Sequence, residues 1–140
     1  MPELILKKQF EDYREGDQDP LKGGLLVSRL IDADLNITWV YDQLRSLAEK
    51  TRAGDDISTF LVELQKFGFE GALDFNNKKL SSIEYVLRNK TGIPISLAMV
   101  IIGVGKLLGF SIKGVNFPGH FLLKSNDLLI DPHGLKTVKV

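Results

Sequence analysis

The chain has 140 residues, 44% of them hydrophobic and 26% charged, which predicts one compact domain with its own core and excludes a disordered chain. It contains no cysteine, which excludes disulfides, thiolate nucleophiles and cysteine-ligated metals, and with the lack of a signal-peptide pattern favours a cytoplasmic location. The formal net charge is zero, but residues 1–70 hold nine Lys and Arg against fourteen Asp and Glu, whereas residues 71–140 hold nine against four.

The first ninety residues have the apolar periodicity of helices. An apolar series near the start is followed by "DPLKGGLLVSRLI", where Asp19 is an N-cap candidate and Pro20 fits the first helical position. Asn36 is expected to cap the next helix, "ITWVYDQLRSLAEK", whose apolar residues recur at helical spacing. This segment carries the clearest amphipathic pattern in the chain.

Two more helices are predicted before residue 92. One runs through "ISTFLVELQKF" and ends before Gly68. The other is "SIEYVLRNK", for which Ser81 and Glu84 have the spacing of a capping box.

A central helix is predicted in "GIPISLAMVIIGVGKLLG", which is apolar on all sides. Pro94 lies in its first turn and Gly109 just past its end. Glycines and Lys106 interrupt the stretch, which falls short of the roughly 20 apolar residues of a transmembrane span. We therefore expect a core helix and no membrane partner.

Short, partly alternating runs follow the central helix and are separated by Gly, Pro, Asn and Ser. This pattern is typical of an antiparallel meander. We predict an α+β domain over residues 1–140, with a helical part (1–90) packed on a central helix and a small antiparallel sheet (91–140). The final "TVKV" reads as a strand still in progress, so the sequence leaves two alternatives: Val140 is the natural end, or the chain is the N-terminal portion of a longer architecture.

A hairpin is predicted in "GHFLLKSNDLLIDPHG", with His120 at the start of one strand and Asp131 at the end of the next. A reversal at Ser125 and Asn126 brings these two side chains opposite each other on one face. A carboxylate opposite a histidine fixes its tautomer and stabilises the imidazolium, as a general base requires. The cross-strand pairs of this register are Lys124 with Asp127, Leu122 with Leu129, and His120 with Asp131.

Ser96 is the nucleophile candidate, because it is the only polar side chain between Gly92 and Gly105. It lies in the first turn of the central helix, where N–H groups and the helix dipole favour developing negative charge. The same serine could instead hydrogen-bond the backbone at the helix start. His120 and Asp131 could likewise form a buried hydrogen-bonded pair without catalytic work.

Three segments carry a family resemblance: "VLRNKTGIPISLAMVIIGVGKLLGF", "GVNFPGHFLLK" and "LLIDPHG". They resemble the SirB-type branch of the transglutaminase-like superfamily, and the upstream "LVSRLIDADLNITWVYDQLRSLAEK" is similar to its helical N-terminal part. The resemblance implies a papain-like fold. It places Ser96 where catalytic members hold cysteine, with His120 and Asp131 at the histidine and aspartate positions.

The serine changes the chemistry that the resemblance implies. A cysteine begins near pKa 8.5 and is readily activated at a helix N-terminus, whereas a serine hydroxyl stays protonated and depends wholly on a well-aimed base. Enzymatic activity is therefore left open. We favour a catalytically silent domain kept for binding or regulation, and the alternative is a serine-dependent amide or ester hydrolase or acyltransferase.

The same part of the sequence bears on metals, cofactors and macromolecular partners. His120, Asp131 and His133 could supply a two-histidine, one-carboxylate metal site, which is the less favoured alternative because a plain hairpin offers no further ligand. No cofactor is expected, since "GVG" at 103–105 lacks the spacing of a phosphate loop. A protein or a peptide is the kind of partner that agrees with these sequence features. Nucleic acid is not expected because the lysines of the second half are spread over several predicted elements, and the oligomeric state is not predicted.

Overall fold

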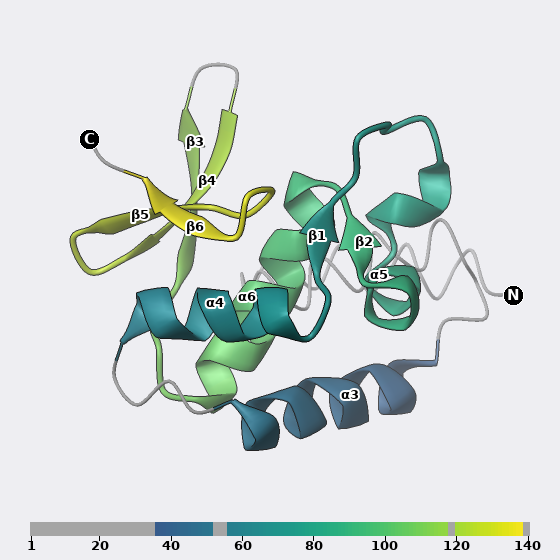
Figure 1. Cartoon of the computed structure of the whole chain (residues 1–140), viewed down its shortest axis with the longest axis horizontal. Helices are drawn as coiled ribbons and strands as arrows, with labels where there is room; N and C mark the ends of the chain where they lie inside the picture. Colours follow the sequence, from purple (N-terminus) through teal and green to yellow (C-terminus); the bar gives the residue numbers. More distant parts are fainter. Residues whose placement is uncertain (1–35, 52–55, 118–119, 139–140) are drawn as a thin grey trace, which may run out of the picture.

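The computed structural model describes residues 36–51, 56–117 and 120–138 (Figure 1). The helix predicted after Asp19 lies outside these residues. The described helices are α3 (Ile37–Lys50), α4 (Ile57–Lys66), the 3-10 helix η1 (Lys78–Ser81), α5 (Ile83–Asn89) and α6 (Pro94–Leu107).

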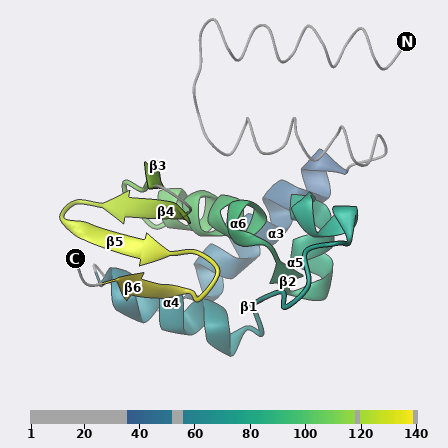
Figure 2. The same ribbon diagram turned by 90° about the horizontal axis from the view of Figure 1, so that it is seen from above.

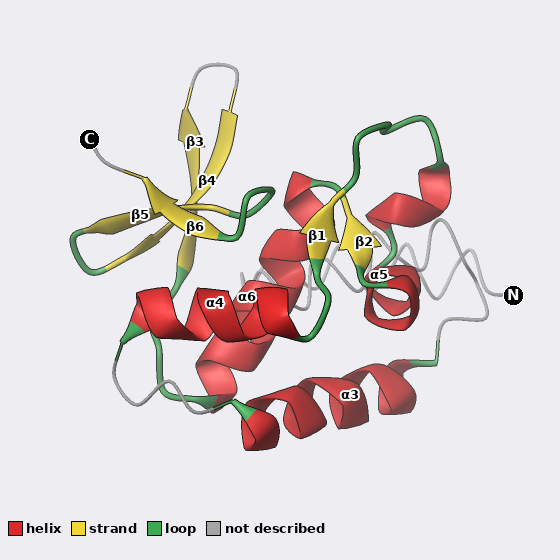
Figure 3. Cartoon of the chain, viewed as in Figure 1, coloured by secondary structure: helices red, strands yellow, loops and turns green. Residues whose placement is uncertain are grey.

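The strands form two small sheets beside the helices, so the predicted α+β class is confirmed (Figure 3). The larger sheet is an antiparallel meander in the order β3-β4-β5-β6, as the sequence predicts. The smaller sheet is a parallel pair, β1 with β2, that the sequence analysis missed. The strands are β1 (Glu70–Gly71), β2 (Thr91–Gly92), β3 (Lys113–Phe117), β4 (His120–Ser125), β5 (Leu128–Asp131) and β6 (Lys136–Val138).

Helix α6 is the centre of the fold, as predicted. It begins at Pro94, and Gly109 follows its end with a φ of 93°, a conformation that glycine adopts without strain. Helices α3 and α5 pack on one side of α6 and strand β4 on another (Figure 2). Its residues from 96 to 105 are all buried. None of the helices in the described ranges is long and apolar enough to cross a membrane.

The helix caps follow the sequence in one case and depart from it in another. Asn36 caps α3 as predicted, since its side-chain oxygen accepts the N–H of Trp39 at 3.0 Å. The predicted capping box of Ser81 and Glu84 is wrong. Ser81 ends η1, so α5 starts at Ile83 with Ser82 at the N-cap, and Glu84 instead accepts hydrogen bonds from Arg88 and from the backbone of residue 36.

The predicted register of the β4–β5 hairpin is also wrong, by two residues. The turn consists of Asn126 and Asp127, not Ser125 and Asn126, and Asn126 takes a φ of 53°. Asparagine tolerates this left-handed conformation better than most residues, which explains why the loop centres there. A shift of two keeps every side chain on its predicted face but changes its partner. The observed pairs are Leu123 with Ile130, Lys124 with Leu129 and Ser125 with Leu128.

Candidate functional site

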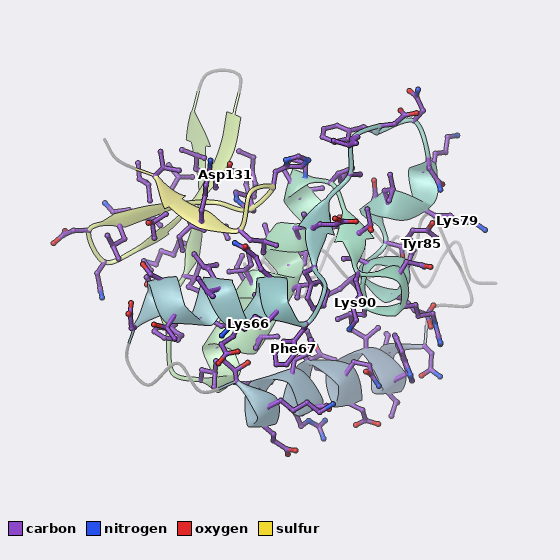
Figure 4. All side chains as sticks on the ribbon, in the orientation of Figure 1. Lys66, Phe67, Lys79, Tyr85, Lys90 and Asp131 are labelled. Atoms are coloured by element: carbon purple, nitrogen blue, oxygen red, sulfur yellow. The ribbon has the colours of Figure 1, made fainter. Side chains whose placement is uncertain are left out.

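A pocket of about 530 Å³ lies between the start of α6 and the larger sheet. Its wall combines apolar and aromatic side chains with one carboxylate and one imidazole. Asp131 stands on the sheet at this pocket (Figure 4). The lining residues are Phe75, Pro94, Phe121, Leu122, Asp131, His133 and Val138.

Ser96 is the third residue of α6. Its hydroxyl both donates a hydrogen bond to the backbone and accepts one from it. Its Oγ donates to the carbonyl of Leu80 at 2.6 Å and accepts the N–H of Ile93 at 3.1 Å. The side chain is only 1% exposed. Gly92 packs tightly against it, because a Cβ at that position would lie 2.8 Å from the serine Oγ. Ser96 therefore joins the start of α6 to the end of η1.

Asp131 and His120 lie on adjacent strands, but they are not directly opposite each other. His120 opens β4 and pairs with Phe117 of β3. Continuing the observed β4–β5 ladder by one step places Asp131 level with Leu122, two residues from His120 and on the same face. The side chain of His120 is outside the described part of the structure, so its hydrogen bond to Asp131 stays a prediction.

Asp131 already has one hydrogen-bond partner. Its Oδ1 accepts the backbone N–H of His133 at 3.0 Å, an Asx-turn that shapes the connection from β5 to β6. The carboxylate thus stabilises a turn while its other oxygen lies beside Gly134, where a Cβ would come within 2.8 Å.

The match to known proteins decides the family. Residues 34–136 match the model described as the transglutaminase-like superfamily. The chain belongs to the transglutaminase-like superfamily.

Relatives of this transglutaminase-like chain occur in bacteria and in animals. It is 33% identical to a UPF0162 protein of Xylella fastidiosa (strain Temecula1), with 94% of this chain and 53% of the relative covered. It is 28% identical to a UPF0162 protein of Vibrio cholerae, with 76% and 43% covered. Human F-box only protein 21 is 38% identical, with 82% and 22% covered. The chain spans about half the length of these bacterial relatives, and no solved structure matches it significantly.

His133 holds the pocket wall of this transglutaminase-like domain together. Its Nε2 donates to the carbonyl of Ala72 at 2.8 Å, which requires the proton on that nitrogen. The ring lies against Gly71, and Phe75 meets it edge-on with the ring centroids 5.6 Å apart. A nitrogen that carries this proton cannot ligate a metal, and within the described ranges no three His, Asp or Glu residues are grouped as metal ligands.

The sequence analysis missed the contribution of the β1–η1 connection to this site. Phe75 lines the pocket, and Ala72 accepts the His133 hydrogen bond. The segment "GALDFNNKK" has neither helical nor strand periodicity, so nothing local shows that it meets a turn sixty residues later. The lack of a side chain at Gly71 is the one available signal, because close approach of another group favours glycine.

Proposed function

We propose that this transglutaminase-like domain is a catalytically silent member of the SirB-type branch that binds a segment of a protein or peptide in the pocket at the start of α6. The proposal rests on the hydrogen bonds of the Ser96 hydroxyl. Its proton goes to the Leu80 carbonyl, and its oxygen accepts the Ile93 N–H. Nucleophilic attack needs that proton to pass to a base, so both backbone groups would lose their partner inside the core.

The properties of the pocket favour binding as the role of a domain without catalytic activity. Its volume falls within the range of ligand sites, roughly 300–1,000 Å³, and its lining is mainly apolar with a few polar groups. Large apolar side chains stand exposed around it. Phe75 in its wall is 55% exposed, and Ile95, which follows Pro94 of the wall, is also exposed. Exposed apolar groups at a pocket mark interaction sites for proteins and peptides.

The reactivity of an introduced thiol tests the proposal, since the native chain has no cysteine. Ser96→Cys should react with iodoacetamide at pH 7 at least about tenfold more slowly than Ser58→Cys, because burial raises the pKa of a thiol and blocks access. Ser58 is a matched control, as it also lies in the first turn of a helix but is exposed. The native serine should not react with a fluorophosphonate.

The alternative is a serine-dependent hydrolase or acyltransferase that uses Ser96, His120 and Asp131. The adjacency of β4 and β5 and the shared face of His120 and Asp131 favour it. Rapid fluorophosphonate labelling of Ser96 that disappears in His120→Ala would establish this alternative and reject the silent domain. Accelerated alkylation of Ser96→Cys that also requires His120 would show a preorganised catalytic site and reject the proposal as well.

A further inference from the structure

Three exposed lysines lie on one face of the larger sheet. Lys113 on β3 is the direct cross-strand partner of Lys124 on β4. Lys136 on β6 is the cross-strand partner of Asp131 on β5. Because Lys124 pairs with Leu129, and Leu129 with Val138, the alternation of side chains puts all three lysines on the same face. The chain thus gathers lysines that are far apart in the sequence.

No ion pair joins these lysines to a carboxylate within the described ranges. The ion pairs of the described residues join Arg45 to Asp42 and Arg88 to Glu84. Asp131 is the cross-strand partner of Lys136 and its carboxylate offsets part of that one charge, which leaves three lysines and one aspartate on the face. Two like charges placed directly opposite across strands destabilise a sheet. A sheet that keeps the Lys113–Lys124 pair has a charged face suited to an anionic partner.

Between Lys124 and Lys136 the same face carries aliphatic side chains and Asp131, and it leads into the pocket. Leu122, Asp131 and Val138 belong to this face by register, and all three line the pocket. Val115 and Leu129 on the same face are half-buried. We call this surface the lysine face and define it by its residues: Lys113, Val115, Leu122, Lys124, Leu129, Asp131, Lys136 and Val138.

We propose that the lysine face docks an acidic protein segment, one of whose apolar side chains enters the pocket at the start of α6. The inference rests on the proposed binding function and adds the charge of the partner. Carboxylates of the segment pair with Lys113, Lys124 and Lys136, and the aliphatic side chains between them cover its apolar atoms.

Protein fits this surface better than nucleic acid. Aliphatic side chains separate the Lys113–Lys124 pair from Lys136, and such residues match apolar side chains of a partner rather than a sugar-phosphate backbone. The face also holds no arginine, the residue that recognises phosphate in a bidentate manner. From β3 to β6 the lysines span three strand spacings, about 14 Å, the length of a helix of roughly ten residues.

Peptide selection on the full chain tests the inference. We would select binders from a library of random peptides of about twelve residues, a length that covers the width of the sheet as a helix. The affinity of the tightest binder, the winner, would be measured by fluorescence anisotropy with a fluorescein label. The selected peptides should be enriched in Asp and Glu around a large apolar residue. The triple variant Lys113→Gln, Lys124→Gln, Lys136→Gln should bind the winner about tenfold more weakly, and added salt should weaken native binding.

A charge-matched variant controls for net charge. Lys66→Gln, Lys78→Gln, Lys79→Gln removes as many exposed lysines from α4 and η1, and should bind within about twofold of the native chain. Lys79 and Asp131 lie well apart in Figure 4. Phe75→Ala removes an exposed side chain of the pocket and should weaken binding independently of salt.

The outcomes separate this inference from the proposed function. Apolar peptides without acidic enrichment, whose binding Phe75→Ala weakens and the lysine-face variant does not, would keep the pocket and reject the acidic partner. Equal losses in the two lysine variants would also reject it, as would tighter binding of an oligouridine than of any selected peptide. Selection of no peptide would reject both the pocket function and the acidic partner.

Discussion

Lys90 ends helix α5 in a left-handed conformation, with a φ of 64°, and its ammonium group lies 4.6 Å from the ring centroid of Phe69. Burial is the larger cause that lowers the pKa of Lys90 from its ordinary value of 10.5, and the positive charge of Lys50 lowers it further. The ring offers a cation–π contact but no counter-charge. The amine therefore gives up its proton more easily in the folded chain than in the unfolded one.

We predict that Lys50→Gln raises the pKa of Lys90 only part of the way to 10.5, because burial remains. A pH titration of the Lys90 side-chain carbons by NMR measures the change, with Lys66→Gln as the control. The unfolded chain binds this proton more tightly, so the free energy of unfolding should rise with pH between the folded pKa and 10.5. A Lys90 pKa that is the same in both variants would contradict the assigned role of Lys50.

Single residues also show why the candidate site was only partly predictable. Pro94 fixes the start of α6, so the place of Ser96 in its first turn follows from the sequence. The partner of its hydroxyl does not follow, because Leu80 belongs to a short 3-10 helix without a periodic signal. The chemistry of Ser96 depends on that partner, so the sequence could not choose between a nucleophile and a helix cap.

At the scale of elements, the prediction succeeds where the pattern is long and fails where it is short. Helices α3 and α6 combine many apolar positions with a clear start at Asn36 or Pro94, and both were predicted. Strands β1 and β2 have two residues each, and their pairing depends on contacts between distant segments. The β4–β5 turn centres on Asn126 and Asp127, with a φ of 53° at Asn126, and a reversal placed one residue too early displaced every pair.

The packing of the β5–β6 turn on strand β1 gives a prediction at this scale. A Cβ at Gly71 would lie 2.4 Å from Nε2 of His133, so Gly71→Ala must displace the imidazole from the Ala72 carbonyl. We expect a loss of about 1–3 kcal/mol in the free energy of unfolding, measured by urea denaturation.

A double-mutant cycle shows whether the imidazole causes that loss. In the background His133→Ala, where the obstructing ring is gone, Gly71→Ala should change the free energy of unfolding by less than about 0.5 kcal/mol. A cost for Gly71→Ala that is equally large in both backgrounds would mean that the strand backbone, and not His133, resists the new methyl group.

At the scale of the whole molecule, one hydrophobic core connects the helices to the sheet. Helix α6 packs against α3 on one side and β4 on another, and buried residues of all three belong to the same cluster. The only tryptophan, Trp39, packs at the edge of this cluster on α3, under the guanidinium of Arg88. Helix α6 therefore gives a packed connection from the sheet to α3.

We predict that Leu123→Ala on β4 lowers the urea midpoint reported by Trp39 fluorescence on α3. Leu123 is 0% exposed, so truncation should cost about 2–5 kcal/mol, and a cooperative core makes the fluorescence and far-UV circular dichroism transitions coincide. Leu128→Ala on β5, where the side chain is 45% exposed, is the control and should cost less than about 1 kcal/mol. If Trp39 fluorescence kept the native midpoint while circular dichroism shifted, the sheet and α3 would unfold as separate units, and the packing through α6 would not couple them.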